Sequence, residues 1–120
     1  MKIIYHVLFA MLLFIFNGNS FAAASNSQPS IITTIESRSS GYHAIYLSNL
    51  IPDQGCYLSD RGVIVEKDVS GKTETAIALT ALSIGKRIIL RVDGCVGIDT
   101  NPGSNPEVTA SRIVKVQIIN

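Results

Sequence analysis

The side chains with the clearest capacity for chemistry in this 120-residue sequence are its two cysteines, Cys56 and Cys95. Each ends a similar stretch, DQGC at 53–56 and VDGC at 92–95. Asp and Gly are typical turn residues, so each cysteine is expected where a strand meets a turn. A redox pair would need a CxxC motif, and a zinc site would need more ligands at short spacing. Neither pattern is present, which favours pairing of the two thiols.

The other groups that could do chemistry are better explained as structural. His43 is expected on a strand, where a histidine is more often a packing residue than a base. The stretch DTNPG (99–103) starts like a calcium loop but lacks the later Gly and Glu of such a loop. Asp60-Arg61-Gly62 is expected to form a turn ion pair, and Glu66 and Asp68 are expected to project into solvent. With no serine in a plausible catalytic set, the sequence predicts no enzyme activity, no cofactor and no metal site.

The first 22 residues have the pattern of a secretory signal peptide. Lys2 precedes an apolar stretch from Val7 to Phe16, and small residues follow, with cleavage expected after Ala22 or, as second choice, after Ala24. An apolar run of about ten residues is too short to span a membrane, which needs roughly 20. The sequence therefore predicts an exported protein, periplasmic or secreted, without stable membrane insertion.

Export places the two thiols in an oxidising compartment, which predicts a Cys56–Cys95 disulfide. Such a bond closes a loop of about 40 residues and raises the free energy of unfolding by about 4 kcal/mol in a chain-entropy treatment. Without the leader, nine basic residues balance nine acidic ones. Nucleic acid is therefore not an expected partner, because phosphate binding needs a basic surplus.

The hydrophobic pattern predicts a single domain at 31–120, preceded by a small, polar and flexible segment at 23–30. Apolar and polar residues alternate in five expected strands, at 31–36, 42–50, 61–68, 86–95 and 110–120. In the last of these, Val114, Val116 and Ile118 are expected on one face. The turn-rich stretch 96–108 is expected to be a loop.

One helix is expected at 70–86, between the third and fourth strands. Ser70 or Thr73 can cap its start, Glu74 suits the positive end of its dipole, and Gly85 suits its C-terminal end. The order strand-strand-strand-helix-strand-strand is that of the five-stranded Greek-key barrel called the OB-fold. The alternative is an open α+β sheet with the helix on one face.

The stretches ETAIALTALSIGKRIILRVDGC (74–95) and RIVKVQI (112–118) carry a resemblance, together with the leader, the size and the cysteine pair. They resemble small exported OB-fold proteins that include the B subunits of subtilase-type and pertussis-like toxins, and related bacterial secreted proteins. The resemblance covers about 65 residues, 55–119. It implies an OB-like fold, and the known B subunits form ring pentamers that bind sialylated glycans. No position of this sequence matches a known sugar contact, and tryptophan, on which sugars often stack, is absent.

The expected helix is apolar on most sides and has no charged residue between Glu74 and Lys86. Its apolar line is expected to comprise Ile77, Ala81 and Ile84, flanked by Ala78 and Leu82. One interpretation is a helix set deep in the barrel mouth. The other is a helix that contacts other copies of the chain. The contact would then be made by Leu79, Thr80 and Ser83.

These observations predict a non-enzymatic binding module of a bacterium, resembling a toxin B subunit, with a glycan or protein ligand and a capacity to form homo-oligomers. The alternative is a periplasmic structural or interaction protein with no small-molecule ligand.

Overall fold

The computed structural model of the chain describes residues 23–38, 41–98 and 108–120. The predicted signal peptide (1–22) and the stretch that resembles a calcium loop (99–103) lie outside these residues. Within the described ranges, no helix is long and apolar enough to cross a membrane.

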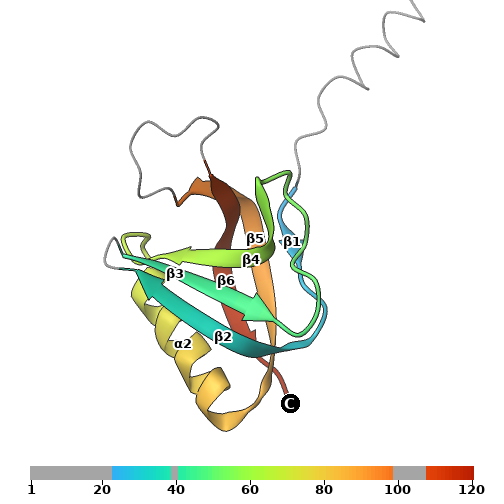
Figure 1. Ribbon diagram of the computed structural model, residues 1–120. Coiled ribbons are helices and arrows are strands. Elements are labelled where there is room, and N and C mark those ends of the chain that lie inside the picture. The colour runs from blue at the N-terminus through green and yellow to red at the C-terminus, as the bar shows by residue number, and fades with distance from the viewer. Residues whose placement is uncertain (1–22, 39–40, 99–107) are drawn as a thin grey trace, which may run out of the picture.

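The strands and the helix follow one another in the predicted order, with one additional strand at the start (Figure 1). The elements are β1 (Ser25–Asn26), β2 (Ser30–Arg38), β3 (Tyr42–Leu47), β4 (Leu58–Val65), α2 (Gly71–Ile84), β5 (Arg87–Gly97) and β6 (Thr109–Ile118). Ser70 occupies the N-cap position, although its side chain makes no capping hydrogen bond. The helix ends at Gly85, whose φ of 67° lies in the left-handed region that favours glycine.

The strands close into a barrel. The sheet order is β1-β5-β2-β3-β4-β6, and β5 also pairs with β6, so β2 to β6 form a closed ring with β1 added beside β5. β4 and β6 run parallel, and the other paired strands run antiparallel. The predicted OB-like barrel with one helix is confirmed, and the open-sheet alternative is wrong because the β5–β6 pairing closes the ring.

Apolar side chains fill the inside of the barrel. The alternation predicted in β5 is confirmed, because Ile88, Leu90 and Val92 are each 0% exposed. At one opening of the barrel, α2 packs against β2 and β6 (Figure 1) and adds Ala78 and Ala81 to the interior. Such small side chains let the helix lie close to the strands.

A second apolar cluster lies on the outer face of β4. The last four residues of this strand are all buried, because Ile64 points into the barrel while Val63 and Val65 belong to the second cluster. Its other buried members are Ala44, Val96, Ile98 and Ala110. A strand that is covered on both faces carries apolar residues in an unbroken run, as β4 does.

The segment 23–30 differs from its prediction as a flexible arm. Within it, β1 pairs with β5. Ser27 is buried, its backbone N–H donates to the Leu90 carbonyl at 2.7 Å, and its Oγ accepts from the Leu90 N–H at 2.9 Å. Short polar residues show no hydrophobic period, so the sequence pattern does not reveal this pairing.

Several strand limits also differ from prediction, and β3 ends at Leu47 rather than at residue 50. β4 begins at Leu58 and ends at Val65, so Glu66 and Asp68 lie in the following turn and not on a strand. β5 does not stop at Cys95 but continues to Gly97, into the stretch expected to be a loop.

The predicted face of β6 is wrong at Val114, because the strand contains a β-bulge. The register moves from Arg91↔Lys115 to Val92↔Ile113, which leaves Val114 as an extra residue. The bulge changes the phase of the alternation, so that Ile113 and Val116 are buried.

Candidate functional site

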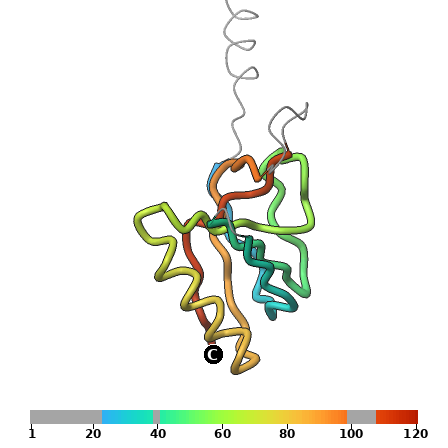
Figure 2. The backbone as a smooth tube through the Cα atoms, turned by 60° about the vertical axis from the view of Figure 1, so that its left-hand side comes forward, coloured from blue at the N-terminus to red at the C-terminus, as the bar shows by residue number. Residues whose placement is uncertain are grey.

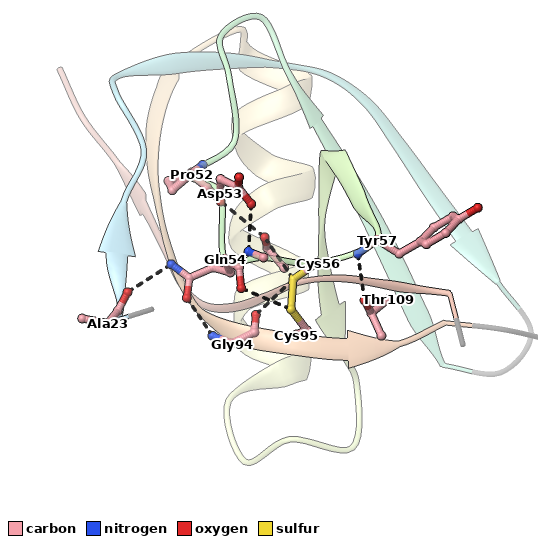
Figure 3. The surroundings of a disulfide bond; sticks show 11 residues. Ala23, Pro52, Asp53, Gln54, Cys56, Tyr57, Gly94, Cys95 and Thr109 are labelled. Atoms are coloured by element: carbon pink, nitrogen blue, oxygen red, sulfur yellow. Dashed lines mark hydrogen bonds between the residues drawn. A yellow bond between two sulfur atoms is a disulfide. The ribbon is translucent and has the colours of Figure 1, made fainter. Parts of the chain in front are cut away.

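The two cysteines form the predicted Cys56–Cys95 disulfide, with an S–S distance of 2.04 Å and a Cα–Cα distance of 5.6 Å (Figure 3). The glycine before each cysteine has a positive φ, 76° at Gly55 and 69° at Gly94. The similar stretches at 53–56 and 92–95 thus adopt the turn geometry expected from their composition. One detail differs, because Cys95 lies within β5 and not at its end.

Gln54 connects three segments at the same end of the barrel (Figure 3). Its side chain is buried, its Nε2 donates to the Ala23 carbonyl at 3.0 Å, and its Oε1 accepts from the Gly94 N–H at 3.1 Å. Beside it, the Asp53 carboxylate accepts from the Gly55 N–H at 2.8 Å. The sequence does not predict this role of Gln54, because a lone glutamine in a turn carries no signal of burial.

The three proposed oligomer-contact residues, Leu79, Thr80 and Ser83, are exposed on α2. Leu79 is 48% exposed. The hydroxyls of Thr80 and Ser83 donate to carbonyls one turn earlier, at 2.9 and 2.8 Å, and so leave no donor for a partner. All three positions face solvent in the single chain.

The predicted apolar line of the helix is only partly correct. Ala78 and Ala81 are buried, whereas Ile84 is 57% exposed. The helix is therefore not set deep in the barrel mouth. Its exposed large apolar residues are Leu79, Leu82 and Ile84.

Glu74 points into the barrel. It was expected only to interact with the positive end of the helix dipole. Its carboxylate is buried and accepts a hydrogen bond from the Val116 N–H of β6. A buried carboxylate is costly unless it is hydrogen-bonded, and a buried N–H needs an acceptor in the same way. The two groups satisfy each other and tie the helix to β6.

His43 has two side-chain partners that were not foreseen. Its Nδ1 lies 2.8 Å from Ser37 Oγ, and its Nε2 lies 3.3 Å from a Glu66 carboxylate oxygen. Serine, histidine and an acid in a row are the components of a hydrolase triad, whose activity also requires an oxyanion site and a place for substrate. Neither of the two surface hollows described below is lined by any of these three residues.

A polar cluster joins β2, β3 and β4 on the outside of the barrel. The guanidinium of Arg61 lies 5.0 Å from the ring centroid of Tyr46 and donates to the Asp60 carboxylate at 2.9 and 3.2 Å. The Tyr46 hydroxyl donates to Glu36 at 3.4 Å. The predicted Asp60–Arg61 pair is present, although it lies within β4 and not in a turn.

The electrostatics of this cluster follow from its contacts. The hydrogen bond from Arg61 lowers the pKa of Asp60, so this carboxylate is ionised at neutral pH. Burial raises the pKa of Tyr46, so its hydroxyl stays protonated. Asp60 is therefore a charged acceptor that is hydrogen-bonded to Arg61, whose guanidinium in turn lies over the Tyr46 ring.

Asp60 also lines a surface hollow of about 360 Å³, formed by residues 47–51 together with Ser59 and Asp60. Two side chains fix the loop that carries it: Ser48 Oγ accepts from the Ile31 N–H at 3.1 Å, and Asn49 donates to the Pro29 carbonyl at 3.0 Å. Leu50 is 89% exposed at this hollow. A carboxylate, hydroxyls, an amide and apolar side chains thus converge on one site.

The described part of the chain contains no group of three or more His, Cys, Asp or Glu side chains that could hold a metal ion. Comparison with protein-family models, curated proteins and solved structures finds no match to this chain.

Proposed function

We propose that this protein is an exported, non-enzymatic binding module, whose ligand contacts the hollow at residues 47–51, Ser59 and Asp60. The observation that carries the proposal is the ionised Asp60 carboxylate, held by Arg61 at the wall of a hollow of about 360 Å³. Pockets of about 300–1,000 Å³ with a few fixed polar groups are typical of sites for small ligands.

Among the two expected ligand classes, glycan and protein, the side chains favour a glycan. Both Asp60 oxygens accept from Arg61, and each keeps a further lone pair that can accept a hydrogen bond from a sugar hydroxyl. The hydroxyls of Ser48 and Ser59 add groups that donate or accept, and Leu50 offers an apolar surface for the C–H face of a sugar ring. The site does not require the tryptophan that the sequence lacks.

Export and kinship with toxin B subunits belong to the same proposal. The disulfide supports an oxidising compartment, and the OB-like barrel agrees with the fold that the resemblance implies. Under this proposal residues 1–22 are a cleaved signal peptide. N-terminal sequencing of exported protein tests it directly, and recovery of Met1 would contradict it.

A glycan array probed with the wild-type protein and with Asp60→Asn tests the binding site. We expect the wild type to retain a defined set of glycans and Asp60→Asn to lose them, because the amide replaces one of the two acceptors with a donor. Leu50→Arg should obstruct the same hollow without disturbing the core. Asp93→Asn removes an exposed carboxylate elsewhere and is the matched control. Equal binding by all variants would contradict this site.

The exposed apolar residues of α2, Leu79, Leu82 and Ile84, favour the alternative of a structural or interaction protein. Under this alternative the protein acts through assembly and not through a small ligand. Light scattering across a concentration series distinguishes the two functions when combined with the array. A stable oligomer with no glycan bound would favour the alternative.

A further inference from the structure

A row of polar side chains crosses three adjacent strands on the outer face of the barrel. Arg91 of β5 is the direct partner of Asn26 in β1 on one side and of Lys115 in β6 on the other. In the next row, Ile89 pairs with Gln117. These five residues line a second surface hollow of about 140 Å³. Figures 1 and 2 show how β1 lies beside β5 and extends this part of the sheet.

The centre of this row holds two like charges side by side. Arg91 and Lys115 are cross-strand partners, and like charges at such positions destabilise a sheet. The ion pairs of the described residues involve Arg38, His43, Arg61 and Arg112, so neither Arg91 nor Lys115 forms an ion pair with a described carboxylate. The hollow is therefore lined by two positively charged side chains, Arg91 and Lys115.

The β-bulge in β6 produces this arrangement. In a regular strand Ile113 and Lys115 would face the same side, because side chains alternate with a period of two. The extra residue Val114 changes the phase, so Ile113 is buried in the barrel while Lys115 is exposed beside Arg91. Bulges often redirect a side chain in this way at functional positions.

The other lining groups are mainly hydrogen-bond donors. An Nη of Arg91 lies 3.5 Å from Asn26 Oδ1, a long hydrogen bond, and the Asn26 NH₂ is a further donor at the hollow. Gln117 carries a second amide, and Ile89 is the one apolar member. A guanidinium, an ammonium and two amides form a set that suits an oxyanion.

We propose that this hollow binds one doubly charged oxyanion, a phosphate or sulfate group. Two adjacent cations match two negative charges, and the guanidinium offers paired N–H groups to two oxygens of the anion. The hollow of about 140 Å³ has room for one such group. This site is separate from the hollow at Asp60, and neither proposal depends on the other.

Titration with sodium phosphate and sodium sulfate, against sodium chloride at matched ionic strength, tests the proposal. Amide chemical shifts of the wild type should saturate in the millimolar range at Asn26, Arg91 and Lys115. Arg91→Gln and Lys115→Gln should each weaken binding about tenfold, because each removes a charged hydrogen-bond donor. Lys72→Gln removes a positive charge from α2 and should bind as the wild type does.

Thermal melting supplies an independent readout. Without oxyanions, Lys115→Gln should melt at or above the wild-type temperature, because the repulsion from Arg91 is gone. On addition of phosphate the wild type should gain more stability than the variant, because the ligand binds only its folded state. An equal gain in both proteins, as expected from general salt effects, would overturn the proposal.

A third arm distinguishes free phosphate from a lipid headgroup. Phosphatidylcholine vesicles with and without phosphatidic acid are sedimented with wild-type protein, Arg91→Gln and Lys115→Gln. Sedimentation that requires phosphatidic acid and both cations would support the site with a lipid phosphate as its ligand. Binding of free phosphate without sedimentation would support it with a soluble ligand. Binding of neither would overturn it.

Discussion

The two ends of the β5–β6 ladder are held by different chemistry. Where Cys95 lies opposite Ser111, the disulfide and the buried Gln54 tie the β3–β4 loop to β5 (Figure 3). Where Leu90 lies opposite Val116, the carboxylate of Glu74 ties α2 to β6 without a covalent bond. The barrel thus has a covalent cross-link at one end, called here the covalent closure, and a buried hydrogen bond at the other, called the polar closure.

The two ends respond differently to their surroundings. A disulfide stabilises mainly by restricting the unfolded chain, and this contribution is lost when the bond is reduced. The Glu74 bond stabilises the native state alone, and it does so by pairing two groups that burial would otherwise leave unsatisfied. The covalent end also anchors the loop with the Asp60 hollow, because residues 47–51 lead directly to Cys56.

Removal of the covalent closure should have the largest effect. The double variant Cys56→Ala/Cys95→Ala should lower the free energy of unfolding by about 4 kcal/mol, because the loop of about 40 residues regains its freedom in the unfolded chain. Urea denaturation of the variant and of the oxidised wild type measures the loss. Reduced wild-type protein is the control and should unfold like the double variant. A loss below about 1 kcal/mol would show that the disulfide is not the main closure of this end.

Removal of the polar closure should have the next largest effect. Glu74→Ala should lower the free energy of unfolding by about 2–3 kcal/mol, because the Val116 N–H would stay buried without an acceptor. Glu74→Gln keeps an acceptor oxygen and should lose less. Hydrogen exchange at Val116 supplies a local readout and should accelerate in Glu74→Ala. If both variants unfold like the wild type, the helix is held by its alanine face alone.

The hydrogen bonds of Gln54 should contribute less than either closure. Gln54→Ala should lower the free energy of unfolding by about 1–2 kcal/mol, because the Gly94 N–H and the Ala23 carbonyl lose their partner while the disulfide remains. Asn49→Ala, which removes an exposed hydrogen bond to Pro29, is the control and should change stability less. If Asn49→Ala lowered the free energy of unfolding more than Gln54→Ala does, the prediction for Gln54 would be wrong.

The smallest effect on folding is expected at the exposed face of α2. Leu79→Glu should change the free energy of unfolding by no more than about 0.5 kcal/mol, because the side chain is half exposed in the single chain. If Leu79 lies in a contact between copies, the same change should convert an oligomer into a folded monomer. Light scattering measures the mass, and Tyr57→Glu, at another exposed apolar side chain, is the control. A wild type that is already monomeric would remove the oligomer interpretation.

Local patterns in the sequence were sufficient for the order of the main elements. The alternation at Ile88, Leu90 and Val92, the Gly85 helix end and the glycine before each cysteine are all features of a few neighbouring residues. Apolar burial and the φ angle of a glycine depend mainly on local chemistry, so these features can be predicted from the sequence alone. The pairing of two cysteines follows from their number.

The tertiary structure decided the features that could carry function. The bulge at Val114, the pairing of β1, the buried Glu74 and the partners of His43 each depend on the register between segments far apart in the chain. A polar side chain is equally compatible with solvent or with a buried partner until its neighbours are placed. Each of the two surface hollows is lined by side chains from separate strands or loops. The sequence alone therefore predicted neither of them.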